Sequence, residues 1–296
     1  MIGRVIKLIS NLWTVDIEGH LKECSSIGKF KYMKISPLVG DMVEIDNENN
    51  VIKRILPRKN ELVRPPISNV DQAIIITSCK EPDFSSNLLD KMLVIIEYNN
   101  IKPIICFTKY DLLSDTSYID NVISYYKSIG YDVYINNEIK DIKEILKGKI
   151  TVLTGQTGAG KSSLLNHLKT DLNLKTGEIS KALGRGKHTT RHVELLDIEG
   201  GLVADTPGFS SLSFIGMNKK DIKDNFIEFY KEENNCKYQD CMHLKEDKCQ
   251  IKELVENKKI LKSRYDNYVK FIESIDDRRW FNESISINIK RIWWFN

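Results

Sequence analysis

The sequence predicts a multidomain chain: an N-terminal β-barrel, a central α/β domain and a C-terminal α-helical metal-binding domain. Three observations support this organisation. Short alternating apolar runs fill residues 1–62, strand-like runs alternate with helical patterns over 63–216, and three cysteines and a histidine cluster within 217–296. A length of 296 residues suits two or three domains.

The N-terminal part alternates apolar and polar residues in short runs, such as 13–17 and 42–45. Turn residues separate these runs, for example at 46–50. The pattern predicts a small barrel of about five antiparallel strands. We expect an OB-fold, a barrel of this size that binds oligonucleotides. The pattern alone does not separate it from an SH3-like barrel.

The central part alternates apolar runs that suit buried strands with helical patterns. We expect strands over 73–77, 103–108, 132–135 and 150–154, helices over 86–98 and 117–129, and an edge hairpin at 193–197 and 202–204. Alternating strands and helices indicate a parallel sheet covered on both faces. From residue 218 onward the pattern is mostly helical.

The composition argues against a membrane protein and leaves nucleic-acid binding open. No apolar run approaches the roughly 18 residues that a membrane helix needs, and the N-terminus lacks a signal core, so we expect a cytoplasmic protein. The net charge is only +3, so a polyanion would be bound by local patches. Candidate contacts in the barrel are Lys29, Lys31, Lys34, Arg58 and Lys59.

A phosphate-binding loop follows the expected strand 150–154. Its residues are Gly155, Gln156, Thr157, Gly158, Ala159, Gly160, Lys161 and Ser162, followed by Ser163, and they match G-x-x-x-x-G-K-[ST]. The glycines let backbone N–H groups turn toward phosphates, and the next helix adds positive potential at its N-terminus. We expect Lys161 to contact the β- and γ-phosphates and Ser162 to bind Mg²⁺.

A second motif, Asp205-Thr206-Pro207-Gly208, ends an apolar strand. Alone it would be an ordinary Pro-Gly turn. In a chain with a phosphate loop, Asp205 is expected to hold Mg²⁺ and Gly208 to offer its N–H to the γ-phosphate.

Thr108, Lys109 and Asp111 resemble the Asn-Lys-x-Asp motif of GTPases. A carboxylate at Asp111 can accept from the guanine N1–H and exocyclic amine, a pair of donors that adenine lacks. The stem of Lys109 can lie over the base, while Thr108 offers one donor where the family usually has Asn. A solvated Lys and Asp at a strand end is the competing interpretation.

The base motif precedes the phosphate loop, whereas ordinary GTPases have the opposite order. With these motifs, segments 60–65, 69–72 and 184–190 and a Cys/His cluster, the chain resembles the RsgA (YjeQ) family of circularly permuted, small-ribosomal-subunit-dependent GTPases. The resemblance covers nearly the whole chain, up to about residue 278. It implies that the protein binds the small ribosomal subunit and its rRNA during late maturation and hydrolyses GTP there; we expect a monomer.

The segment between the phosphate loop and Asp205 has the composition of a switch. Residues 179–193 contain no acid, four basic residues and two histidines. The resemblance implies that Thr189 or Thr190 binds Mg²⁺ in the GTP state and that His188 acts with Lys161 in catalysis. A solvated mobile loop and an RNA-facing histidine are the alternatives.

Phe209 stands where many GTPases have the glutamine that orients the attacking water. Its side chain cannot orient water. We therefore expect slow intrinsic hydrolysis, with a partner supplying or arranging the missing group.

Cys236, Cys241, His243 and Cys249 supply three thiols and one imidazole within a short segment. This is a complete tetrahedral shell for structural Zn²⁺, with no position left for a catalytic water. Cysteine clusters in reducing compartments more often bind metal than form disulfides. Free cysteines and a surface histidine are the alternative.

Two rival functions stay open on the sequence alone. A P-loop ATPase or nucleotide kinase shares the phosphate loop, and Asp111 argues against it. A nucleotide-gated RNA-binding scaffold with little hydrolysis is consistent with Phe209. Competition between GTP and ATP distinguishes a GTPase from the ATPase or kinase. A rate of GTP hydrolysis that small subunits stimulate distinguishes it from the scaffold.

Overall fold

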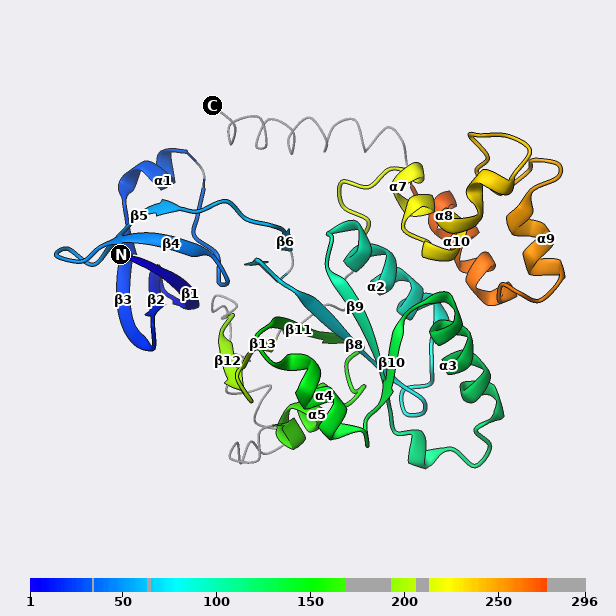
Figure 1. The fold of residues 1–296 in the computed structure, drawn as a ribbon, viewed down its shortest axis with the longest axis horizontal. Helices are drawn as coiled ribbons and strands as arrows, with labels where there is room; N and C mark the ends of the chain where they lie inside the picture. The colour runs from blue at the N-terminus through cyan, green and yellow to red at the C-terminus, as the bar shows by residue number, and fades with distance from the viewer. Residues whose placement is uncertain (34, 63–64, 169–192, 206–212, 276–296) are drawn as a thin grey trace. The chain divides into compact units, whose positions relative to one another are not determined.

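The computed structural model describes residues 1–33, 35–62, 65–168, 193–205 and 213–275 (Figure 1). The chain divides into two compact units. One takes in the described residues of Met1–Asp83, Asn99–Asp115 and Asp132–Ser210, and the other those of Phe84–Tyr98, Thr116–Tyr131 and Ser211–Asn296. Each unit combines segments that are separate in the chain, so this division does not test the domain limits expected at residues 62 and 216. Those limits stay a prediction.

The N-terminal part of the first unit is a closed five-stranded barrel in the order β1-β2-β3-β5-β4. Its elements are β1 (Ile2–Ile9), β2 (Leu12–Ile17), β3 (His20–Ser26), α1 (Gly28–Tyr32), β4 (Met42–Asp46) and β5 (Val51–Ile55). All pairs are antiparallel except β3 with β5. Alternation buries Val5, Val15, Val43 and Ile52 completely. This Greek-key order confirms the predicted barrel and the OB-fold.

A buried ion pair connects the barrel to a short hairpin of β6 (Glu61–Leu62) and β7 (Ile67–Ser68). Arg58 donates to both carboxylate oxygens of Asp41 at 2.7 Å, and the Ser68 hydroxyl donates to the same carboxylate at 2.6 Å. Asp41 is fully buried and the Arg58 side chain is 11% exposed. The expectation that Arg58 contacts RNA is therefore corrected, because its guanidinium is engaged within the protein.

A six-stranded sheet in the order β10-β9-β8-β11-β13-β12 forms the rest of the first unit. Its strands are β8 (Gln72–Ser78), β9 (Lys102–Thr108), β10 (Asp132–Ile135), β11 (Ile150–Gly155), β12 (Leu195–Ile198) and β13 (Gly201–Asp205). The strands are parallel apart from the edge hairpin β12–β13. The predicted parallel sheet and its edge hairpin are confirmed.

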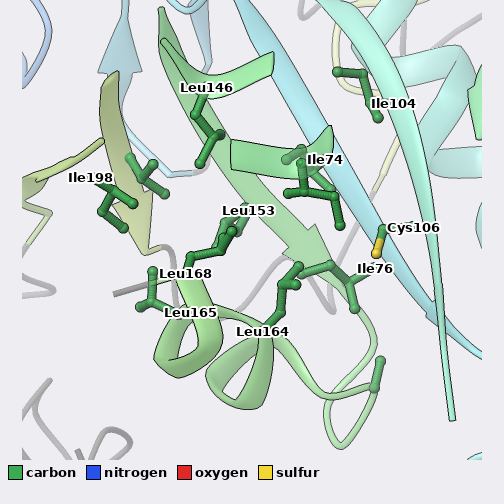
Figure 2. Packing of buried hydrophobic residues seen from close by; sticks show 13 residues of the cluster. Ile74, Ile76, Ile104, Cys106, Leu146, Leu153, Leu164, Leu165, Leu168 and Ile198 are labelled. Carbon is green, nitrogen blue, oxygen red and sulfur yellow. The ribbon is translucent and has the colours of Figure 1, made fainter. Parts of the chain in front are cut away.

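The hydrophobic core of this unit lies between one sheet face and the helices α4 (Ile139–Leu146) and α5 (Lys161–Leu168). Figure 2 shows Leu164, Leu165 and Leu168 of α5 packed toward Leu153 of β11. Burial of these leucines fixes the first turns of α5 against the strand that precedes it. The phosphate loop between β11 and α5 is thus held at both ends by apolar packing.

The second unit is helical. Its elements are α2 (Ser86–Tyr98), α3 (Ser117–Ile129), α7 (Lys219–Asp224), α8 (Ile227–Glu232), η2 (Glu233–Asn235), α9 (Gln250–Glu256) and α10 (Lys262–Ser274). Phe226, Phe229, Tyr268 and Phe271 form its aromatic centre, and α2 packs against α10. Across the described part of the chain, no helix is both long and apolar enough to cross a membrane.

Candidate nucleotide site and metal centre

The phosphate loop turns at glycines whose backbone and surroundings demand them. Gly155, Gly158 and Gly160 have φ values of 148°, 82° and 95°, a region that side chains disfavour. A Cβ at Gly155 would lie 2.1 Å from the backbone oxygen of Ile76 on the neighbouring strand β8. The Gly160 carbonyl accepts from the Leu164 N–H at 2.9 Å, which begins α5 directly behind the loop. The loop therefore presents a helix N-terminus, as phosphate binding requires.

Lys161 folds back onto the same loop. Its ammonium donates to the backbone oxygens of Gly155 at 2.8 Å and Gln156 at 3.2 Å. The positive charge is thus kept at the loop where phosphate oxygens would bind. Ser162 and Ser163 occupy the next positions of α5, within its first turn.

The base motif contacts the phosphate loop directly. Thr108 ends β9, is 3% exposed and donates its hydroxyl to the Ala159 carbonyl at 2.5 Å. The hydroxyl also lies 3.4 Å from the Thr77 carbonyl of β8. A hydroxyl carries one proton, and the Thr108 hydroxyl donates its proton to the Ala159 carbonyl of the loop. Thr108 is therefore placed to support the phosphate loop, whereas the sequence suggested that its hydroxyl donates to the base.

Lys109 and Asp111 follow at the carboxyl end of β9. Lys109 has φ 57° and leads into the single turn η1 (Tyr110–Leu112), which carries Asp111 on the surface. The Lys109 ammonium donates to the Glu81 carbonyl. An exposed carboxylate two residues after a partly buried lysine at the end of a strand is compatible with base recognition.

Sequence reasoning missed a third segment of this site, residues 79–82 after β8. The Cys79 N–H donates to the Thr108 carbonyl at 2.9 Å, and Glu81 holds Lys109. Pro82 lies next to the loop, because a Cβ at Gly158 would be 3.6 Å from its Cδ. Strands β9, β8 and β11 are neighbours, so their carboxyl ends meet at one edge, where open α/β sheets bind ligands. The position of Glu81-Pro82 after a fully buried strand was the signal available.

Asp205 ends β13, which lies beside β11 with Asp205 paired to Leu153. Its backbone is therefore at the same sheet edge as the phosphate loop. Gly208, Phe209, His188, Thr189 and Thr190 lie outside the described residues.

The four predicted metal ligands come together in the second unit. Their ligand atoms all lie within 4.8 Å of one another. His243 Nδ1 is 3.6 Å from Cys236 Sγ and 3.4 Å from Cys249 Sγ. Zinc bonds of about 2.3 Å to sulfur and 2.0 Å to nitrogen place such atoms roughly 3.5 Å apart in a tetrahedron. The donor set and its spacing therefore fit Zn²⁺ bound through Nδ1.

Burial shifts the pKa values of two of these candidate ligands in ways that bear on metal binding. Burial lowers the pKa of His243 to about 4, which keeps the imidazole in the neutral form that ligates. Burial also raises the pKa of the Cys241 thiol to about 12, so a cation is needed to ionise it at neutral pH.

The metal loop is braced by groups that the sequence analysis did not single out. Glu246 accepts from the backbone N–H groups of Met242 at 2.9 Å and Leu244 at 2.7 Å. Tyr265 and Tyr268 of α10 donate to the carbonyls of His243 at 2.7 Å and Met242 at 2.6 Å. Two tyrosines spaced i, i+3 on α10 were the available signal.

Family models match most of the chain. The RsgA N-terminal domain matches residues 2–52, and the RsgA GTPase matches residues 55–215. The chain belongs to the RsgA GTPase family. Curated relatives named small ribosomal subunit biogenesis GTPase RsgA include those of Bacillus cereus, 48% identical over 288 residues, and Bacillus subtilis (strain 168), 46% identical over 292 residues. Each alignment covers 94% of this chain and 98% of the relative.

Two solved structures share the fold of this RsgA-family chain. YloQ, described as a circularly permuted GTPase, aligns with a TM-score of 0.78 at 41% identity over 94% of this chain and 95% of its own. YjeQ from Thermotoga maritima aligns with a TM-score of 0.77 at 34% identity over 93% and 99%. The recognised resemblance and the permuted architecture are confirmed. The permutation leaves the site intact because β9 and β11 flank β8 irrespective of their order in the chain.

Proposed function

We propose that this RsgA-family chain is a GTPase that acts in small ribosomal subunit biogenesis: it binds the subunit late in maturation, hydrolyses GTP and leaves. The observation that carries the nucleotide part is the contact between Thr108 and Ala159, which places the base motif next to the phosphate loop. The names of the Bacillus relatives support the subunit as the setting.

In this proposal each segment of the site has a separate role. Residues 155–163 hold the phosphates, with Lys161 on the β- and γ-phosphates. Ser162 and Asp205 bind Mg²⁺, and Gly208 senses the γ-phosphate. Asp111 recognises guanine while the Lys109 stem covers the base. Thr108 supports the phosphate loop through its hydrogen bond to the Ala159 carbonyl.

Hydrolysis is slow without a partner in this proposal, because Phe209 replaces the water-orienting glutamine. His188 takes part in catalysis, and Thr189 or Thr190 joins the Mg²⁺ shell when GTP is bound. The small subunit arranges these groups, an effect that can be worth about 10³–10⁵ in rate.

The remaining parts hold the subunit. The barrel and the zinc-bound helical domain contact rRNA, with exposed Lys29 among the contacts. Zn²⁺ on Cys236, Cys241, His243 and Cys249 is structural, because its four ligands leave no open position. We propose a cytoplasmic monomer.

The deciding experiment is single-turnover GTP hydrolysis with and without purified small ribosomal subunits. We expect a slow rate alone and an acceleration of at least a hundredfold with subunits. A fast rate that subunits leave unchanged would refute subunit-dependent catalysis. Binding to subunits with no hydrolysis in either condition would favour the nucleotide-gated scaffold.

Competition between nucleotides tests the base site separately. Excess GTP should displace a labelled guanine nucleotide, whereas ATP at the same concentration should not. Equal displacement by both nucleotides would favour a P-loop ATPase.

A further inference from the structure

The second unit contains a fully buried arginine that belongs to neither the nucleotide site nor the metal shell. Arg264 of α10 is 0% exposed. It forms a two-bond fork with Glu228 of α8, at 2.6 and 3.0 Å, and donates to Asp90 of α2 at 2.6 Å. Its guanidinium also lies 4.5 Å from the ring centre of Phe226. Buried charges persist only when paired and hydrogen-bonded, so this arginine fixes the helices that supply its partners.

Those partners extend the network to α2 and α3. Asp90 is fully buried and accepts from the Tyr126 hydroxyl of α3 at 2.5 Å and from Asn267 of α10 at 2.7 Å. Asn267 also donates to Ser86 at the start of α2 at 3.2 Å. One face of α10, carrying Arg264 and Asn267, is therefore hydrogen-bonded to α2 and reaches α3 through Asp90, which accepts from Tyr126. The Arg264 guanidinium also lies 5.6 Å from the centre of the Tyr126 ring.

The neighbouring face of α10 is bonded to the metal loop. Tyr265 and Tyr268 follow Arg264 and Asn267 by one residue each, and their hydroxyls hold the carbonyls of His243 and Met242. Phe229, next to Glu228 on α8, packs edge-on against the His243 ring, with the two ring centres 5.8 Å apart. The residues of α10 that contact α2 and α3 are thus each followed by a residue that holds the backbone of the metal loop.

We propose that α10 couples the metal centre to α2 and α3, so that metal occupancy controls the local stability of these two helices. The RsgA GTPase match, residues 55–215, contains both helices, and α2 leads along the chain into β9 and the base motif. A helix of 13 residues is marginal alone, and α10 depends on its partners for order. Loss of metal releases the loop that two of its tyrosines hold. The proposal rests on the proposed zinc centre.

Hydrogen exchange measured by mass spectrometry on the full-length, metal-loaded protein tests the coupling. After chelation, peptides spanning α2 and α3 should exchange at least tenfold faster, together with residues 236–249. Peptides of the barrel strands β4 and β5 and of α5 serve as internal controls and should not change. Faster exchange in 236–249 with unchanged α2 and α3 would overturn the coupling.

Metal content, measured first by elemental analysis, separates this proposal from the zinc centre itself. A protein that binds no metal would overturn both. A protein that binds one zinc and shows no response in α2 and α3 would overturn the coupling alone.

A double variant removes the connection without touching a ligand or the buried charges. In Tyr265→Phe with Tyr268→Phe, zinc content should be retained, while chelation should accelerate exchange in α2 and α3 by less than threefold. Tyr230→Phe is the matched control, since Tyr230 lies on α8 and is 56% exposed; it should retain the full response. An undiminished response in the double variant would contradict the role of α10.

Discussion

At the scale of single residues, Thr108 makes a contact that its motif alone does not predict. The sequence offered it as a donor to guanine, yet its buried hydroxyl bonds the Ala159 carbonyl. The partner lies 51 residues further along the chain, so no local pattern could reveal the contact. Asp111, by contrast, could be proposed from the sequence because its motif is local, and its role in base recognition stays a prediction.

Replacing Thr108 therefore should affect phosphate binding. Thr108→Ala removes the donor to the Ala159 carbonyl, which costs about 1–3 kcal/mol, or roughly five- to 150-fold in affinity for GTP and GDP alike. Thr108→Ser keeps the hydroxyl and should restore most of the affinity. Equilibrium titration with fluorescent GTP, GDP and 6-thioguanine nucleotides checks this, because sulfur replaces a base oxygen to which a hydroxyl can donate. A loss of affinity that differs between guanine and 6-thioguanine nucleotides would instead mean that Thr108 contacts the base.

Asp111→Asn should reverse base preference without harming the phosphate loop. The amide can no longer accept both guanine donors, and loss of two charge-assisted hydrogen bonds is worth about 3 kcal/mol, or roughly a hundredfold in GTP affinity. Xanthine carries a carbonyl in place of the exocyclic amine, so XTP affinity should rise. Competition titrations measure both values, with the exposed Asp120→Asn on α3 as control. Unchanged GTP affinity would remove Asp111 from the base site.

At the scale of elements, the sequence predicted those features that depend on neighbours in the chain. The strands β8, β9 and β11 were predictable because each is a continuous apolar run, typical of parallel strands buried on both faces. The Cys/His cluster was predictable because its four members all lie between residues 236 and 249. For the segment at Glu81 and Pro82, the sequence showed only its position after a buried strand, because its contacts with Lys109 and the phosphate loop depend on strand order.

The close approach of the phosphate loop to β8 yields a prediction for Gly155. Gly155→Ala would place a Cβ 2.1 Å from a backbone oxygen that cannot move without breaking the pairing of β8 with β11. We expect a loss of about 1–3 kcal/mol in the free energy of unfolding and loss of nucleotide binding. Gly28→Ala is the control, because nothing lies within 4 Å of its Cβ. Urea denaturation measures both, and equal midpoints would contradict the steric argument.

At the scale of the whole molecule, the sequence did not show which helices pack together into one unit. Arg264 looks like an ordinary polar residue of an amphipathic helix, and its partners Asp90 and Glu228 are 174 and 36 residues away. Charged residues are almost never fully buried unless paired, so a sequence-based reading places them in solvent. The compact unit formed by α2, α3 and the C-terminal helices follows from this pairing.

The same network predicts a non-additive response to mutation. Arg264→Met leaves Asp90 and Glu228 buried without their counter-charge, and breaking such a buried pair costs about 3–5 kcal/mol of unfolding free energy. Adding Asp90→Asn and Glu228→Gln removes both stranded charges while leaving hydrogen-bond acceptors for Tyr126 and Tyr125. The triple variant should therefore recover at least half of the loss. Urea denaturation of the metal-loaded variants measures each value, and a triple variant less stable than Arg264→Met would show that the polar contacts, not the charges, hold these helices together.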